Sequence, residues 1–159
     1  MSVTAVPNKS SPKSSIRVDR GALSRARTIL VAGPPECVLT VTRTLAGKGT
    51  SFQIATTLKD AERNLVPGLT LILCGLHFDR GRIFEFLRKA KASPYTATVP
   101  FVCVRAVGLL NKQLSSRGIE VASRELGAAA YVDYAHLAHT LGEDAAAKHL
   151  RDIVSTLCE

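Results

Sequence analysis

From residue 28 onward, short apolar runs alternate with segments whose apolar residues have a helical spacing. The run Leu69–Cys74 is almost continuously apolar, which is typical of a strand that is covered on both faces of a sheet. Strands that alternate with helices form parallel sheets, so this order predicts an α/β fold with a doubly wound sheet in the strand order 2-1-3-4-5. The other four expected strands are Thr28–Ala32, Phe52–Ala55, Val99–Val104 and Ala129–Val132.

Five helices are expected between and after these strands. The first begins at Pro34-Pro35, because proline in the first turn loses no hydrogen bond, and it ends before Gly47. The segment from Thr57 to Asp60 resembles a capping box and predicts a second helix. The remaining helices are expected at about Ile83–Lys91, Leu110–Leu126 and Ala145–Leu157, with a long loop at Ala135–Gly142 before the last one.

The first 26 residues differ in composition from the rest of the chain. They are rich in Ser, contain two prolines and show no periodic apolar pattern, so we expect a flexible basic arm followed by one domain over residues 27–159. Of the net charge of +8, the first 27 residues carry +5, from six Lys or Arg and one Asp. This composition fits a solubilising linker best, and a nucleic-acid-binding arm or an organelle transit peptide are the alternatives.

The sequence also predicts where the protein works. No apolar stretch approaches the roughly 18–20 residues that cross a bilayer, and the N-terminus lacks the apolar core of a secretion signal. We therefore expect a cytoplasmic protein that does not bind membranes. The four cysteines form no Cys-x-x-Cys pair, and Cys74 and Cys103 lie in apolar runs, so we expect them to pack in the core.

Three segments resemble parts of the receiver domain of bacterial response regulators. Leu71–His77 is similar to the third receiver strand, which ends in the phosphoacceptor Asp. Pro100–Val104 is similar to the fourth strand, and Leu126–Val132 to the Gly-Ala-x-x-Tyr segment that leads into the fifth. In this order the resemblance covers about residues 28–158, and it implies a flavodoxin-like fold and a role in two-component phosphorelay signalling.

The residues that carry receiver chemistry are missing from these segments. In that family two acids and the acceptor Asp bind Mg²⁺, the Asp attacks phosphorus, and a Thr or Ser and a Lys contact the phosphoryl group. The resemblance therefore implies a degenerate pseudo-receiver that is not an enzyme and needs neither metal nor cofactor. It places the acid pair at Ala32-Gly33 or Gly33-Pro34, the acceptor at Gly75, the Thr or Ser at Arg105 and the Lys at about Tyr134.

Nearby charged residues do not restore the site. Asp79 is four residues past Gly75, about 12 Å of extended chain, and Glu36 is expected in a helix's first turn, where the dipole alone favours an acid. Arg105 has two interpretations. It forms an anion clamp, joined by Arg80 and Arg82, or, as we favour, it points to solvent or forms a surface ion pair with Asp79 or Asp133.

The preferred hypothesis is a signalling module that binds a protein partner without phosphorylation. The partner would be a kinase, an output protein or a second copy of the chain in a homodimer. The resemblance implies that partners bind the face of the fourth helix, fifth strand and fifth helix. Two alternatives remain open: an anion or small-molecule sensor at Gly33, Gly75 and Arg105, and a nucleic-acid-associated regulator that uses the basic arm. The candidate interface residues are Tyr131, Tyr134, His136 and His139.

His136 and His139 also have a spacing at which two histidines on a helical turn share a metal. Their nearest further ligand in sequence, His149, is remote, so a surface or loop-packing role is preferred. Gly47–Thr50 resembles a phosphate loop only superficially, because it follows a helix and precedes a strand.

Deleting the arm should leave the domain folded, because the arm has no apolar face with which to pack. We expect the midpoint of thermal unfolding to fall by less than about 4–8 °C, the shift that corresponds to about 1 kcal/mol in a domain of this size. Calorimetry on the full chain and on a chain without residues 2–26 measures the difference. A larger drop would mean that the arm packs on the domain.

Overall fold

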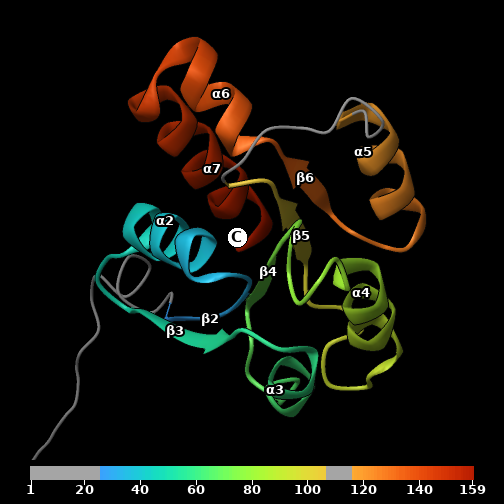
Figure 1. Cartoon of the computed structure of the whole chain (residues 1–159). Helices are drawn as coiled ribbons and strands as arrows, with labels where there is room; N and C mark the ends of the chain where they lie inside the picture. The colour runs from blue at the N-terminus through green and yellow to red at the C-terminus, as the bar shows by residue number, and fades with distance from the viewer. Residues whose placement is uncertain (1–25, 107–115) are drawn as a thin grey trace, which may run out of the picture.

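A five-stranded parallel sheet forms the centre of the computed structural model, which describes residues 26–106 and 116–159. The strand order is β3-β2-β4-β5-β6, so the predicted order 2-1-3-4-5 and the flavodoxin-like fold are confirmed (Figure 1). Each pair of neighbouring strands is parallel. The strands are β2 (Arg27–Ala32), β3 (Thr50–Ala55), β4 (Leu71–Gly75), β5 (Phe101–Val104) and β6 (Ala130–Val132).

The central strands are buried on both faces. Every residue of β4 and β5 is buried, and successive side chains of a strand point to opposite faces. In β4, Leu71 and Leu73 belong to one core cluster, whereas Ile72 and Cys74 belong to the cluster across the sheet. This two-sided burial is the physical reason why the sequence shows a continuous apolar run there.

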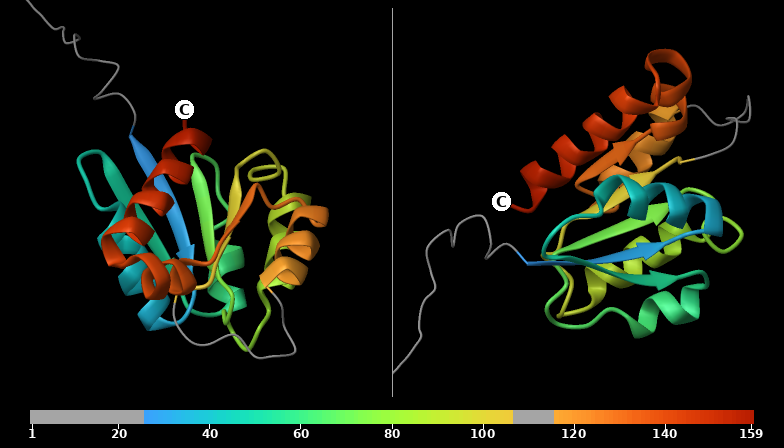
Figure 2. Two further views of the ribbon diagram at one scale, coloured as in Figure 1. Left: turned by 90° about the horizontal axis from the view of Figure 1, so that it is seen from above. Right: turned by 90° about the vertical axis from the view of Figure 1, so that its left-hand side faces the viewer.

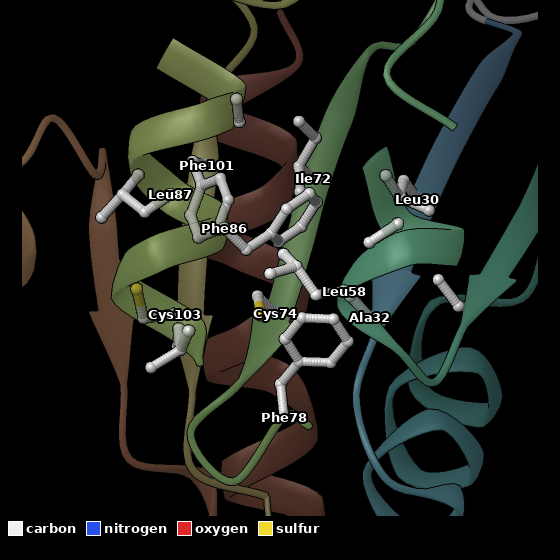
Figure 3. Close-up of a cluster of buried hydrophobic side chains, with 14 of the residues drawn as sticks. Leu30, Ala32, Leu58, Ile72, Cys74, Phe78, Phe86, Leu87, Phe101 and Cys103 are labelled. Carbon is white, nitrogen blue, oxygen red and sulfur yellow. The ribbon is translucent and has the colours of Figure 1, made fainter. Parts of the chain in front are cut away.

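Helices α2 (Pro35–Leu45) and α7 (Glu143–Leu157) cover one face of the sheet (Figure 2). Helices α3 (Leu58–Arg63), α4 (Ile83–Ala92) and α5 (Ser116–Glu125) cover the other. On that second face, the ring of Phe86 lies between those of Phe78 and Phe101, with both pairs of centroids 5.6 Å apart (Figure 3). Among the described residues, no helix is long and apolar enough to cross a membrane.

The segment before α7 is a helix, so the expected long loop at Ala135–Gly142 is wrong. Helix α6 (Tyr134–Leu141) begins after Asp133, whose carboxylate accepts a hydrogen bond from the backbone N–H of His136 at 3.1 Å. It ends at Gly142, which has a φ of 98° and donates its N–H to the carbonyl of Ala138. The structure therefore contains six helices within the described residues, where the sequence predicted five.

Two expectations reach beyond the described residues. The predicted helix Leu110–Leu126 corresponds to α5, which begins at Ser116, and its earlier part lies outside them. The predicted arm over residues 1–26 also lies outside them, apart from Ala26. The predicted bounds of the other elements differ from the observed ones by a few residues.

Candidate functional site

The carboxyl ends of the strands meet at one edge of the sheet, and Gly75 lies at the centre of this edge. Gly75 ends β4, which lies between β2 and β5. A Cβ atom at this position would lie only 2.8 Å from Sγ of Cys37 and 3.5 Å from Cδ of Pro34. Cβ atoms do not approach other atoms that closely, so the Cys37 thiol occupies the space that a side chain at position 75 would need.

The first turn of α2 brings Cys37 to this place. Pro34 caps the helix, and its carbonyl accepts a hydrogen bond from the N–H of Val38 at 3.0 Å. Gly33, before the cap, donates its N–H to the carbonyl of Ala55 at 3.0 Å. A Cβ at Gly33 would lie 3.1 Å from Cys37 Sγ, so glycine at both positions allows the helix to begin close to the sheet.

The Cys37 thiol is a packing group and not a nucleophile. Burial, with a smaller effect of the Glu36 charge, raises the pKa of Cys37 to about 11. Burial likewise raises the pKa of Cys103 to about 12 and that of Cys74 well above its ordinary value. The thiolate is the reactive form, so at neutral pH these cysteines behave as small apolar groups. The expected core positions of Cys74 and Cys103 are confirmed, and all four cysteines are free thiols.

Arg105 follows β5 and forms a buried ion pair with Asp133, which follows β6. Arg105 Nη2 lies 2.8 Å from Asp133 Oδ1, and the two side chains are 6% and 14% exposed. The Arg105 backbone is also fixed, because its N–H donates to Val132 and its carbonyl accepts from Ala135, each at 2.9 Å. The ion-pair interpretation with Asp133 is therefore confirmed, but its expected place at the surface is wrong. A buried pair is costly to break, so it links the ends of β5 and β6 rigidly.

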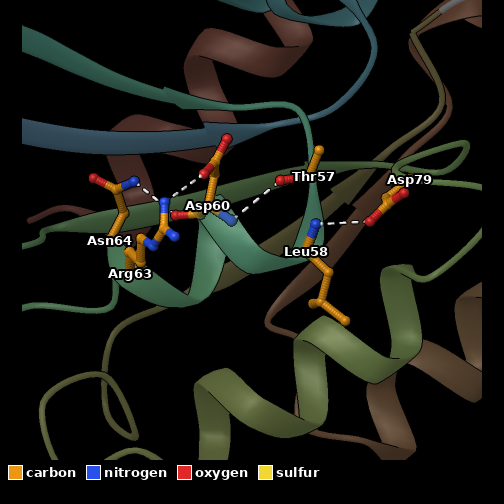
Figure 4. Close-up of polar contacts among 6 residues, drawn as sticks. All are labelled: Thr57, Leu58, Asp60, Arg63, Asn64 and Asp79. Atoms are coloured by element: carbon orange, nitrogen blue, oxygen red, sulfur yellow. Dashed lines mark hydrogen bonds and ion pairs between the residues drawn. The ribbon is translucent and has the colours of Figure 1, made fainter.

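Asp79 binds the start of α3, which follows the carboxyl end of β3. Its Oδ2 accepts a hydrogen bond from the N–H of Leu58 at 2.8 Å, beside the Thr57 cap of α3 (Figure 4). The same oxygen lies 4.0 Å from Nη1 of Arg82. The predicted capping role of Thr57 is confirmed, because its hydroxyl accepts from the N–H of Asp60. Asp79 therefore satisfies a free N–H at the start of α3.

Tyr131 and Tyr134 do not lie on one surface. Tyr131 packs against the core cluster on the α3 and α4 side, whereas Tyr134 belongs to the cluster on the α2 and α7 side. As a candidate interface residue Tyr134 was expected at the surface, and this is wrong, because its side chain is buried at 5% exposure. Its hydroxyl donates to Oε2 of Glu143 at 3.0 Å, and burial raises its pKa. Tyr134 thus fastens the start of α6 to α7.

His136 and His139 are both exposed, on α6 rather than in a loop. Within residues 26–106 and 116–159, no group of three or more His, Cys, Asp or Glu side chains is arranged to hold a metal ion. A contact of the two histidines with a partner stays a prediction.

In sequence, the chain matches no family model and no curated protein. In structure, it is similar to receiver domains. The phosphorylated cyanobacterial phytochrome response regulator RcpA is 14% identical, with a TM-score of 0.64 over 84% of this chain and 96% of that one. A receiver domain of a Pseudomonas aeruginosa sensor histidine kinase, which holds magnesium in its active-site cleft, is 15% identical, with a TM-score of 0.61 over 84% and 98%. The HemR receiver domain of Leptospira biflexa is 21% identical, with a TM-score of 0.58 over 81% and 94%.

The chain has the fold of a response-regulator receiver domain. Gly33, Gly75 and Arg105, which the resemblance assigned to three of the phosphorylation-site positions, lie at the carboxyl ends of neighbouring strands of this receiver fold. Tyr134, assigned to the fourth, lies one residue beyond Asp133 with its ring in the core. The strand ends of the receiver fold therefore carry two glycines and an arginine that is paired with Asp133.

Cys37 is the residue of this edge that the sequence did not reveal. Cys37 and Gly75 are 38 positions apart in the sequence, and no local sequence pattern predicts their contact. The available signal was indirect: two glycines at the ends of neighbouring strands indicate that another segment approaches the backbone closely.

The contact between Cys37 and Gly75 predicts a coupled pair of substitutions. Gly75→Ala should lower the free energy of unfolding by about 1–3 kcal/mol, because the new methyl group overlaps the Cys37 thiol. In the Cys37→Ala background the same change should cost at least about 1 kcal/mol less. Urea denaturation of the four proteins in this cycle measures the coupling.

Gly47→Ala is the matched control, because a Cβ at Gly47 meets no atom within 4 Å. It should change stability by less than about 0.5 kcal/mol. Additive effects of Gly75→Ala and Cys37→Ala would contradict the contact.

Proposed function

We propose that this chain is a cytoplasmic signalling module of the receiver type that binds protein partners and is not controlled by its own phosphorylation. The observation that carries the proposal is the Cys37 thiol packed against Gly75. Aspartyl phosphorylation needs a carboxylate at that position and room for a phosphoryl group beside it. Here the position has no nucleophile, and the space is filled.

The charges at the strand ends support the same proposal. Binding Mg²⁺ requires several oxygen ligands on one side of the ion. Asp133 is engaged with Arg105, and Asp79 is engaged with the N–H of Leu58. Neither carboxylate is free to join a metal site, so we propose that the protein is not an enzyme.

The surface beside edge strand β6 is the proposed contact for a protein partner. A hollow of about 400 Å³ lies there between α5, β6 and α7. Its floor includes Ala130 of β6, and its walls include Arg124 of α5 with Ile153 and Thr156 of α7. We name this hollow the β6 groove. It lies on the face that the receiver resemblance implies for partners, and a mixture of apolar and charged groups suits a protein interface.

Helix α6 extends this surface, because it packs along α7. Its exposed side chains include His136, His139 and Leu141. We propose that His136 and His139 contact the partner directly. Tyr134 contributes by holding α6 in place, and Tyr131 contributes by shaping β6 from the other face of the sheet.

The geometry does not favour a small-molecule or anion sensor at the strand ends. Such a site needs free backbone N–H groups and an unpaired cation. The Gly33 N–H already donates to Ala55, the Cys37 thiol covers Gly75, and Arg105 is paired with Asp133.

Acetyl phosphate should not phosphorylate this protein. After incubation with acetyl phosphate and Mg²⁺, the intact mass should remain that of the unmodified chain, because no acceptor carboxylate lies at the end of β4. A receiver domain that retains the acceptor Asp, treated in parallel, shows that the reagent is active. A phosphoryl adduct that hydroxylamine removes would overturn the proposal.

Self-association, if the partner is a second copy, should depend on the β6 groove. Thr156→Arg places a long charged side chain in the groove and should weaken the dimer by about 1–2 kcal/mol, the scale of an interface contact. Ser155→Arg is the matched control, because Ser155 is the neighbouring exposed residue of α7 and lines a different hollow. Sedimentation equilibrium measures both dissociation constants.

The double change His136→Ala and His139→Ala tests α6 in the same assay and should also weaken the dimer while leaving the unfolding midpoint unchanged. If all these variants and the unaltered chain had equal dissociation constants, the β6 groove and α6 would not be part of the interface.

A further inference from the structure

A second hollow lies at the opposite edge of the sheet, where the strands begin. It has a volume of about 290 Å³, and its lining includes three cations, Arg27, Lys48 and Arg151. The hydroxyl groups of Thr50 and Ser155 also line it, and among the described residues no acidic side chain does. We name this hollow the basic pocket. It shares no lining residue with the β6 groove.

The first residues of two neighbouring strands form one side of the basic pocket. Arg27 begins β2 and Thr50 begins β3, and the two residues are register partners in the parallel sheet. Register partners point to the same face of a sheet, and alternate residues of a strand share that face. Arg27 is two residues before Ile29, which packs on the α2 and α7 side. The side chains of Arg27 and Thr50 therefore lie on the α2 and α7 side as well.

Helix α7 and the turn between α2 and β3 form the other sides. Arg151 and Ser155 are four residues apart on α7, so they lie on one face of this helix. Lys48 lies in the turn, which is tied to β2 because the Arg27 N–H donates to the carbonyl of Gly49 at 2.7 Å. The end of α7 lies beside the start of β2 (Figure 2). Three segments that are distant in sequence thus place their cations around one hollow.

The three cations of the pocket have no acidic partner. Within residues 26–106 and 116–159 no ion pair involves them, whereas Lys148, on the same helix as Arg151, pairs with Asp152 at 2.7 Å. Arg151 also lines a neighbouring hollow that contains Glu143 and Asp144, but it pairs with neither. A cleft that is lined by charges of one sign concentrates counter-ions, so the pocket attracts anions.

Two hydroxyl groups beside these cations are available to a ligand. Thr44 also lines the pocket, but its hydroxyl already donates to the carbonyl of Thr40 at 2.7 Å. In the part of the chain that the structure describes, the hydroxyls of Thr50 and Ser155 form no such hydrogen bond. They can therefore donate to the oxygen atoms of a bound anion.

The size and charge of the pocket indicate which anion fits. Ligand pockets have volumes of about 300–1,000 Å³, and this one is at the lower end, so its ligand is compact. A phosphoryl group carries about 1.5–2 negative charges at neutral pH, so two such groups balance three cations and one does not. Guanidinium and hydroxyl groups are donors that contact phosphate oxygens. The described lining has no aromatic side chain on which a nucleotide base could stack.

We propose that the basic pocket binds a compact anion with two linked phosphoryl groups, either free diphosphate or the diphosphate of a small metabolite. Arg27, Lys48 and Arg151 contact the phosphoryl oxygens, and Thr50 and Ser155 donate hydrogen bonds to them. This binding site goes beyond the protein-binding role proposed above and does not depend on it. It lies at the other edge of the sheet from the positions that receiver chemistry uses.

Isothermal titration calorimetry of the full chain with inorganic diphosphate tests the proposal, at about 150 mM salt and without divalent metal. The pocket variant carries Arg27→Gln and Arg151→Gln. The matched control carries Lys59→Gln and Arg88→Gln, which remove the same charge from exposed positions on α3 and α4. The pocket variant should bind diphosphate at least about tenfold more weakly than the control, because it loses two charge-assisted contacts.

Ser155→Ala tests direct contact without a change of charge. It should weaken diphosphate binding about three- to tenfold, because one hydrogen bond to the anion is lost. Thr156→Ala is the matched control, because the Thr156 hydroxyl donates to the carbonyl of Asp152 at 3.0 Å and lies outside the lining of the basic pocket. This variant should bind diphosphate as the unaltered chain does.

Thermal unfolding followed by circular dichroism checks that each variant is folded. A ligand that binds only the folded chain raises the unfolding midpoint, so diphosphate should raise it in the control and much less in the pocket variant. If the pocket variant does not fold, Lys48→Gln in the exposed turn replaces it, and Lys59→Gln becomes the control.

Other anions identify the chemistry of the ligand. Inorganic monophosphate and citrate, a compact anion with three carboxylates, should each bind at least about tenfold more weakly than diphosphate, since neither presents two linked phosphoryl groups. ADP separates the two sources of the diphosphate. Binding of ADP as tight as that of diphosphate would support a small metabolite, and binding of diphosphate alone would support the free anion.

Four results would overturn the proposal. They are no binding of diphosphate by the full chain, equal affinities of the pocket variant and its control, equal affinities of Ser155→Ala and Thr156→Ala, and binding of monophosphate or citrate as tight as that of diphosphate.

Discussion

The burial of β2, β4 and β5 between two layers of helices is the constraint on which the rest of this structure depends. A parallel strand with both faces covered leaves exposed only its two ends, so polar groups concentrate where the strands begin and where they stop. At the carboxyl ends, the Cys37 thiol, the two glycines and the Arg105–Asp133 pair form a closed and electrically balanced edge. At the amino ends lies a hollow whose lining includes Arg27, Lys48 and Arg151 and no acidic side chain. Receiver chemistry uses the first edge, and among the described residues three cations for which no ion pair is found gather at the second.

The closed edge gives the protein a rigid framework for its other surfaces. Asp133 pairs with Arg105 and also caps α6, so one carboxylate ties the end of β5 to the helix that follows β6. Tyr134 then binds α6 to α7 through its buried ring and its hydrogen bond to Glu143. Through these contacts α6 and α7 are held against the sheet edge as one unit, and the exposed histidines and the β6 groove are presented in a fixed arrangement. A preorganised surface loses less conformational entropy when a partner binds.

The sequence predicted the sheet because the signal for a buried strand is local. Leu71–Cys74 is apolar without interruption, and its neighbours in the sheet have the same character, so a parallel sheet followed from the alternation with helices. The order 2-1-3-4-5 was chosen among the common orders of doubly wound sheets. Helix α6 was missed because its start depends on the Asp133 side chain, and Asp133 was considered as a site residue and not as a cap. The contact of Cys37 with Gly75, the burial of Arg105 and the opposite orientations of Tyr131 and Tyr134 depend on tertiary packing. Residue types and spacing alone do not determine them.

The close packing of Cys37 on Gly75 also limits which side chains position 75 can accept. A single substitution could not introduce an acid at position 75, because the Cys37 thiol would have to be replaced by a smaller side chain first, and Cys37→Ala or Cys37→Gly alone would leave a void under α2. Even after both changes, the ion pair with Arg105 would keep the carboxylate of Asp133 from binding a metal ion. A carboxylate at the end of β4 would therefore need several coordinated substitutions, because the packing around Gly75 leaves room for glycine alone.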